Sequence, residues 1–173
     1  MTPRKIVIIG PESTGKSTLS AALAAHFNAP WNQEYAREYL EKLNRPYKAS
    51  DLLTIAQIQV QREQAALTAS PKYLFCDTDC YVLKVWSEAR YGCCDLKILN
   101  EIATNKYQLY LLTDIDLPWV FDPLREHPAK QDRVYFFKQY LDIVQNSGVP
   151  WVRISGDHHQ RLNAAIDAVQ TLL

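Results

Sequence analysis

The feature that most constrains the fold of this chain is the run Gly10–Ser17, which matches the phosphate-binding pattern G-x-x-x-x-G-K-[ST]. Four β-branched residues, Ile6–Ile9, precede it, as in a strand that is buried on both faces of a parallel sheet. A run of helix formers over residues 16–27 follows it. A chance glycine turn would not require the lysine, the serine and both flanking elements. The sequence therefore predicts a strand, loop and helix that bind a nucleoside triphosphate.

The residue types of this loop assign a role to its members. Glycines let successive backbone N–H groups turn toward a phosphate, and the helix N-terminus adds further donors. We expect Lys16 to contact the β- and γ-phosphates of ATP and to act in catalysis, and Ser17 to bind Mg²⁺. The nucleotide-binding residues expected in the loop are Gly10, Glu12, Ser13, Thr14, Gly15, Lys16, Ser17 and Thr18.

Composition excludes several function classes. The length of 173 residues suits a single domain, expected to span residues 1–173. Its 19 basic and 19 acidic residues give a formal net charge of zero, so nucleic acid and anionic membranes are not expected partners. No segment reads as a membrane span or signal peptide, so we expect a cytoplasmic protein with a small-molecule partner. A homo-oligomer is compatible with the sequence. The four cysteines lack metal-ligand spacing, which favours reduced thiols over structural zinc.

Strands and helices alternate along the chain. The predicted strands are 5–9, 30–33, 73–76, 109–112 and 151–154. The predicted helices are 16–27, a helix opening at 34–40, 50–69 with Ser50 as its N-cap, 80–91, 95–104, 132–145 and 161–172. This order predicts an α/β, three-layer P-loop NTPase fold, with a five-stranded parallel sheet and helices on both faces. Ligands bind at the carboxyl ends of such strands, so the polar residues there are the candidates.

Two aspartates follow the third predicted strand. Asp77 stands where P-loop enzymes place a carboxylate that orders Mg²⁺. Asp79 could accept a proton from an attacking hydroxyl or hold a sugar hydroxyl, so both are candidate catalytic residues, and Asp79 is also a candidate acceptor ligand. The alternative is that they cap the following helix, which is compatible with catalysis.

The run after the second strand offers acceptor ligands. Glu34 could accept ribose hydroxyls, Tyr35 could stack on a flat ring, and Arg37 could bind a phosphate. The alternative is an exposed helix surface, where Arg37 and Glu41 form a favourable pair one turn apart.

A proline-rich segment over residues 117–131 predicts a mobile lid. Arg125, with Arg133 beyond it, would bring positive charge over the transferring phosphoryl group, and Trp119 is a candidate acceptor contact. The alternative is a solvated basic face with Trp119 as a hydrophobic plug. After the last strand, Gly156 is expected beside the adenine, or else in an ordinary strand-to-helix turn.

Several motifs together resemble the ribosylnicotinamide kinase domain of NadR proteins, within the P-loop kinase superfamily. They extend over residues 5–157 and read GPESTGKSTL, EYAREYL, LFCDTD, KVWSE, YG and YLLTDIDLPWVFDPLRE. The resemblance implies transfer of the γ-phosphoryl group of ATP, with Mg²⁺, to the 5′-hydroxyl of nicotinamide riboside, which yields nicotinamide mononucleotide for NAD biosynthesis. We expect a kinase domain alone, without the adenylyltransferase and DNA-binding domains of NadR proteins.

Two alternatives stay open at this point. A P-loop kinase of this kind could act on another nucleoside or small metabolite. A protein of another class, a nucleotide-dependent switch or assembly ATPase, would hydrolyse ATP without any acceptor. The basic lid near strand-end carboxylates favours the kinase.

Overall fold

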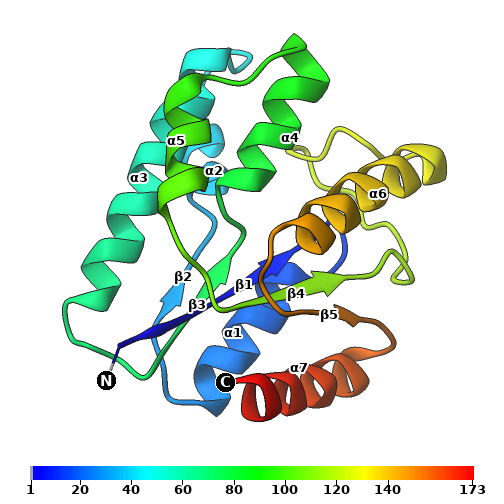
Figure 1. Ribbon diagram of the computed structural model, residues 1–173. Helices are drawn as coiled ribbons and strands as arrows, with labels where there is room; N and C mark the ends of the chain where they lie inside the picture. The colour runs from blue at the N-terminus through cyan, green and yellow to red at the C-terminus, as the bar shows by residue number, and fades with distance from the viewer. Residues whose placement is uncertain (1) are drawn as a thin grey trace.

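The computed structural model describes residues 2–173 and contains a parallel sheet covered by helices on both faces (Figure 1). The strand order is β2-β3-β1-β4-β5, and every neighbouring pair is parallel. The strands are β1 (Arg4–Ile9), β2 (Trp31–Asn32), β3 (Tyr73–Asp77), β4 (Leu109–Thr113) and β5 (Trp151–Ile154). The predicted fold class is confirmed.

The central position of β1 explains its composition. It pairs with β3 on one side and with β4 on the other, and Ile6–Ile9 are fully buried. A strand without a solvent face needs apolar side chains on both faces, which four consecutive β-branched residues supply. The loop that follows β1 therefore emerges in the middle of the carboxyl edge of the sheet.

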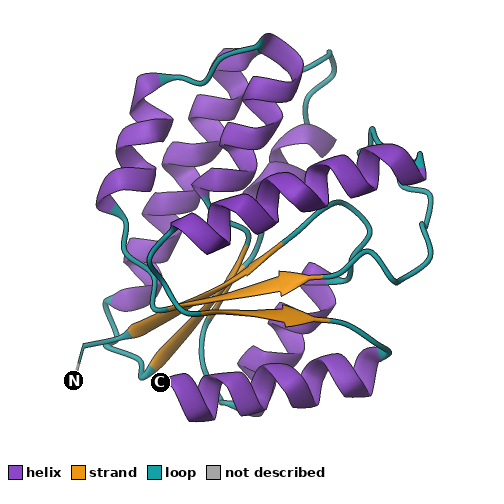
Figure 2. Ribbon diagram, turned by 45° about the vertical axis from the view of Figure 1, so that its right-hand side comes forward, coloured by secondary structure: helices purple, strands orange, loops and turns teal. Residues whose placement is uncertain are grey.

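The helices divide between the two faces (Figure 2). They are α1 (Lys16–His26), α2 (Tyr35–Glu41), α3 (Ala49–Leu67), α4 (Cys80–Tyr91), α5 (Leu96–Thr104), α6 (Lys130–Asn146) and α7 (His158–Leu172). Helices α1 and α7 pack against one face through Leu23 and Val169. Helices α4 and α6 pack against the other face through Val82 and Phe136. The alternating side chains of β1 contribute to both cores.

A third apolar cluster lies apart from the sheet. It joins α2, α3, α4 and α5 through Ala36, Ile55, Leu83 and Ile98. Figure 1 shows these helices grouped on one side of the molecule, beyond the β2 side of the sheet. We call this group of helices the acceptor-side bundle.

Helix α6 begins two residues before its predicted start, and the starts of α3 and α7 differ from the prediction for reasons of capping. Helix α3 begins at Ala49, so Ser50 is inside the helix and is not its N-cap. The Asp51 carboxylate instead accepts the backbone N–H of Lys48 at 2.7 Å. Helix α7 begins three residues earlier than predicted, because Asp157 and Gln160 form a reciprocal capping box.

Cys76 and Cys80 are buried, Cys93 is exposed, and none of the four cysteines is in a disulfide. Burial raises the pKa of the Cys76 thiol well above its usual value, as expected for a small apolar residue of the core. Within residues 2–173, no helix is both long and apolar enough to cross a bilayer.

Candidate functional site

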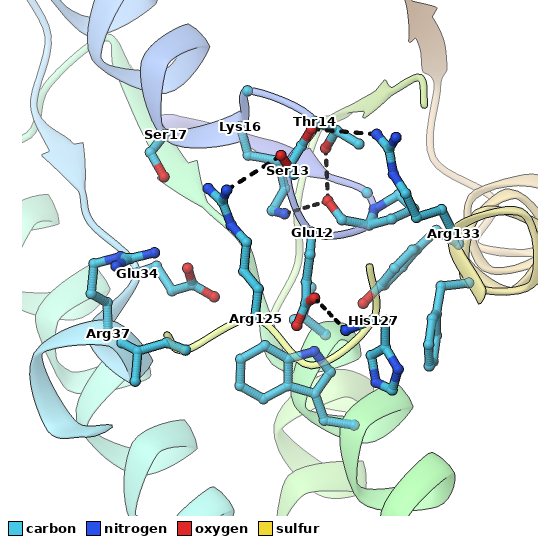
Figure 3. Close-up of a pocket in the computed structure, with 18 of the residues that line it drawn as sticks. Glu12, Ser13, Thr14, Lys16, Ser17, Glu34, Arg37, Arg125, His127 and Arg133 are labelled. Atoms are coloured by element: carbon cyan, nitrogen blue, oxygen red, sulfur yellow. Dashed lines mark hydrogen bonds between the residues drawn. The ribbon is translucent and has the colours of Figure 1, made fainter. Parts of the chain in front are cut away.

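A cleft opens at the carboxyl edge of the sheet, where the sequence places the phosphate-binding loop. It encloses about 990 Å³, including the part open to solvent. Gly10–Thr18 line it, together with Glu34, Arg37, Arg125 and Arg133 (Figure 3). The fold therefore brings together four separate segments that the sequence predicts as site residues.

The phosphate-binding loop has the backbone of an anion nest. Gly15 and Ser13 have positive φ angles of 78° and 57°, which turn their neighbouring N–H groups inward. A non-glycine residue such as Ser13 is strained at a positive φ angle, and strained residues of this kind are typical of functional loops. At Gly10 a Cβ atom would lie 2.8 Å from the carbonyl oxygen of Thr113, so the close approach of β4 requires glycine.

Lys16 and Ser17 stand where the donor phosphates are expected. The Lys16 ammonium donates a 2.8 Å hydrogen bond to the Pro11 carbonyl, across the mouth of the loop. Ser17 is exposed in the first turn of α1, and its hydroxyl lies close enough to the Asp77 carboxylate to lower the pKa of that group.

Asp77 has the surroundings of a magnesium ligand. It ends β3, is 1% exposed, and its Oδ1 has no hydrogen-bond partner among the described residues. Burial raises the pKa of Asp77, while the Ser17 hydroxyl and the Lys16 ammonium oppose that rise. An orphaned carboxylate oxygen beside a serine hydroxyl fits a hard cation such as Mg²⁺.

Asp79 has a different environment from the one predicted. One carboxylate oxygen accepts the Tyr81 backbone N–H at 2.9 Å, which caps α4, and the other accepts the Tyr110 hydroxyl at 2.9 Å. Burial raises the pKa of Asp79 to about 7. Asp79 therefore caps α4 and, like Asp77, does not line the cleft; its catalytic and acceptor-binding roles stay predictions.

Glu34 lies at the N-terminus of α2 and lines the cleft. Figure 3 shows it pointing inward beside Arg37. Burial raises the pKa of Glu34 to about 7, and the positive charge of Lys16 only partly offsets this. A carboxylate with a pKa near neutrality in a cleft is suited to proton transfer.

Tyr35 and Arg37 differ in their placement. The Tyr35 ring lies in the acceptor-side bundle under the Arg62 guanidinium, 4.3 Å from the ring centroid, and does not line the cleft. Its predicted stacking role is therefore not supported. Arg37 lines the cleft and forms a 2.8 Å ion pair with Asp122.

The predicted lid is a segment without helix or strand, from residue 114 to residue 129, so α6 begins inside the last two predicted lid residues. The Glu12 carboxylate accepts the backbone N–H groups of Glu126 and His127 at 3.1 and 3.2 Å. The Ser13 hydroxyl accepts the Val120 N–H at 3.0 Å. The phosphate-binding loop thus holds the segment over the cleft.

The basic residues of this region have separate roles. Arg125 donates to the Ser13 hydroxyl at 3.3 Å and lies over the Trp119 ring. Trp119 does not line the cleft, so its predicted acceptor contact is not supported. Arg133 is on α6, is 8% exposed, and has an Nε without a partner among the described residues. The same guanidinium donates to the Ser13 and Leu117 carbonyls at 3.4 and 3.0 Å, so it is held beside the loop with one N–H left for a phosphate.

Gly156 belongs to the edge of the site. It lies between β5 and α7 with a φ of 93°, and it does not line the cleft. Its backbone N–H donates to Asp116 at 2.5 Å. The adenine contact predicted for Gly156 stays a prediction.

Sequence reasoning missed the aromatic wall of the site. Trp86 lines the cleft and an adjoining second cavity of about 650 Å³, a volume that again includes the part open to solvent. The two cavities share the lining residues Glu12, Leu40, Trp86, Leu124, His127 and Phe136. The available signal was the spacing of Val82 and Trp86, which places both on one side of α4.

Comparisons with known proteins agree with this geometry. A family profile, that of the AAA domain, matches residues 5–161. The chain is 27% identical to the trifunctional NAD biosynthesis/regulator protein NadR of Escherichia coli (strain K12), over 98% of this chain and 43% of that protein. The NadR protein of Salmonella typhimurium has the same identity and coverage. The chain thus spans less than half the length of these curated relatives.

Solved structures give a similar result. A crystal structure of NadR protein in complex with NR superposes with a TM-score of 0.78 at 26% identity, covering 98% of this chain and 51% of that chain. Thymidylate kinase from Ehrlichia chaffeensis has a TM-score of 0.65 at 18% identity, with full coverage of both chains, and shows the fold alone. The predicted resemblance to the kinase part of NadR proteins is confirmed.

Proposed function

The chain belongs to the AAA domain family. We propose that it is a Mg²⁺- and ATP-dependent kinase that phosphorylates nicotinamide riboside at its 5′-hydroxyl. The proposal rests on one juxtaposition. Glu34, with a pKa near neutrality, lines the cleft together with Lys16, and Trp86 and Phe136 line both that cleft and an adjoining aromatic-walled cavity. That arrangement offers a place for two substrates, whereas a hydrolase needs a place for one.

The donor half binds the triphosphate. The inward N–H groups of the loop and the N-terminus of α1 surround the β- and γ-phosphates. Lys16 exchanges its hydrogen bond to the Pro11 carbonyl for a phosphate oxygen. Arg133 and Arg125 add positive charge from the lid side, where charge develops on the transferred group.

Ser17 and Asp77 are the residues that would hold Mg²⁺. The ion supplies charge neutralisation across the phosphate oxygens. Asp77 is ionised when it serves in this way, and the nearby Lys16 ammonium and Ser17 hydroxyl favour that form.

Glu34 replaces Asp79 as the residue that handles the acceptor proton. The Glu34 carboxylate takes the proton of the acceptor hydroxyl as the oxygen forms a bond to the γ-phosphorus. The bond from that phosphorus to the β–γ bridging oxygen breaks, and ADP leaves with the electron pair. Much of the rate enhancement comes from alignment and fixed charge.

The second cavity accommodates the ring of the acceptor. Trp86 supplies aromatic surface and Glu12 a carboxylate, whereas Tyr47 and Glu126 at the same cavity are already engaged by the Arg90 guanidinium, 4.3 Å from the Tyr47 ring centroid and 2.9 Å from the Glu126 carboxylate. Aromatic faces and carboxylates both attract a planar cation, which describes the pyridinium ring of nicotinamide riboside. NadR proteins, the curated relatives, are named for NAD biosynthesis, which agrees with this acceptor.

The test is a product assay with purified protein, Mg²⁺-ATP and a panel of nicotinamide riboside, uridine, thymidine and adenosine, read by mass spectrometry. We expect one phosphoryl group on nicotinamide riboside, and little ADP when no acceptor is present. If a different nucleoside were phosphorylated and nicotinamide riboside were not, the proposed acceptor would be wrong. If ATP were hydrolysed steadily and no acceptor stimulated the rate, the protein would be a switch or assembly ATPase and not a kinase.

A further inference from the structure

Arg161 is a buried arginine to which the proposed reaction assigns no role. It lies one turn into α7, on the face of the sheet opposite the acceptor-side bundle, and is 4% exposed. Buried guanidinium groups are costly unless all their donors find partners. The partners of Arg161 therefore indicate what it is for.

These partners come from three different strand-end loops. Arg161 donates to the Thr14 carbonyl at 3.0 Å, to the Gly156 carbonyl at 2.7 Å and to the Asp114 carbonyl at 3.3 Å. It also pairs with the Asp116 carboxylate. One planar group thus joins the phosphate-binding loop, the segment after β4 and the turn after β5.

The bond to Thr14 has a consequence for phosphate binding. The Thr14 carbonyl and the Gly15 N–H belong to one planar trans peptide, so they point in opposite directions. Arg161 holds the carbonyl from outside the loop, which keeps the N–H of Gly15 directed toward the cleft that Gly15 lines. The Thr14 hydroxyl also donates a hydrogen bond to the Pro11 carbonyl and shares one with the Thr113 hydroxyl, so the side chain of Thr14 is fixed as well.

Asp116 extends the connection to the turn after β5. Its carboxylate binds Arg161 and accepts the Gly156 N–H at 2.5 Å. The turn that the sequence places beside adenine and the loop that surrounds the phosphates therefore share one arginine.

We propose that Arg161 is a positioning residue for the nucleotide, which orients the phosphate-binding loop and, through Asp116, the adenine-side turn as one unit. This inference rests on the proposed binding of ATP, and it is independent of the identity of the acceptor. Arg161 contacts no residue of the second cavity among its hydrogen-bond partners, so the acceptor half does not depend on it.

The experiment measures dissociation constants for ATP and for inorganic tripolyphosphate by calorimetry. Arg161→Met is compared with Arg153→Met, a matched control in which an arginine bound to the Asp114 side chain, but not to the phosphate-binding loop, is removed. We expect Arg161→Met to weaken both ligands about tenfold. The control should stay within about twofold of the wild type for both ligands. Binding of ATP by the wild type tests the proposed function separately.

Two further variants keep the test decisive if Arg161→Met does not fold. Arg161→Lys retains the charge but not the planar fork, so both ligands should again weaken. Asp116→Asn should weaken ATP about threefold and leave tripolyphosphate unchanged, since only the adenine side is disturbed. Unchanged binding of both ligands in Arg161→Lys and Asp116→Asn would overturn the proposal.

A KM comparison separates positioning from general support of the fold. The KM for ATP should rise in Arg161→Lys, while the KM for whichever acceptor is active stays within about twofold of the wild type. An equal rise in both KM values, accompanied by a lower melting temperature, would show that Arg161 supports the fold and does not position the nucleotide.

Discussion

The donor and acceptor halves of the cleft are built in opposite ways. The donor half comes from one continuous run, Gly10–Thr18, fixed between β1 and α1 and braced by Thr113 and Arg161. The acceptor half collects single residues such as Glu34 and Trp86 from α2, α4, α6 and the lid. Phosphate recognition needs backbone N–H groups in a fixed order, which neighbouring residues supply. Recognition of a ring needs side chains from several directions.

The largest expected effect falls on the donor half. Lys16→Ala removes the one lysine that lines the cleft among the described residues, so kcat should fall by about a hundred- to a thousand-fold. Steady-state assays with saturating substrates measure this. Lys138→Ala, an exposed lysine of α6, should leave the rate unchanged. Full activity in Lys16→Ala would show that the donor half of the cleft does not act as proposed.

Glu34→Gln tests whether the acceptor half contributes a base. The carboxylate accepts a proton only when ionised, so the kcat of the wild type should rise with pH through about 7. The variant should lose about a hundredfold in kcat, together with that pH dependence. Glu38→Gln, on the same helix but paired with Arg62, is the control. An unchanged pH profile in Glu34→Gln would assign the proton to another group.

Trp86→Leu addresses the aromatic wall directly. Loss of ring stacking should raise the KM of the acceptor about tenfold and leave the KM of ATP unchanged. The matched variant is Trp119→Leu, because Trp119 packs on Arg125 outside both cavities and should have little effect on the acceptor. If Trp119→Leu raised the KM of the acceptor more than Trp86→Leu did, the acceptor contact that the sequence predicts for Trp119 would be supported after all.

The smallest expected effect concerns the junction of the two halves. Arg37 and Asp122 form an ion pair between α2 and the lid, and the Arg37 side chain is 45% exposed. Asp122→Asn should therefore raise the KM of the acceptor by no more than about fivefold at low salt, and the difference should shrink at high salt. Asp142→Asn on α6 serves as the control. A large effect that persists in high salt would mean that Asp122 contacts substrate.

The same contrast explains what the sequence could predict. The P-loop and the sheet follow from local pattern, since both depend on contiguous residues and on the alternation of strands and helices. Asp77 and Asp79 show where local pattern fails. The proposed magnesium ligand and the helix cap have the same residue type two positions apart, and only the contacts of their oxygens distinguish them.

The acceptor residues were harder to predict for a geometric reason. Tyr35 and Trp86 are both aromatic residues on helices, and the direction of each side chain depends on how the helices pack together. The packing turns Tyr35 toward Arg62 in the acceptor-side bundle and turns Trp86 into the cleft. The spacing of Val82 and Trp86 places both on one side of α4, but it does not say which neighbouring element that side faces.

The separate apolar cluster of the acceptor-side bundle has an evolutionary consequence. Because α2 to α5 share a core of their own, substitutions there can reshape one wall of the cleft while the core beneath α1 and α7 is undisturbed. A lineage with this architecture can change its acceptor by drift in a single module and retain the same phosphoryl donor. The arrangement therefore allows new substrates to be acquired without reinventing the chemistry.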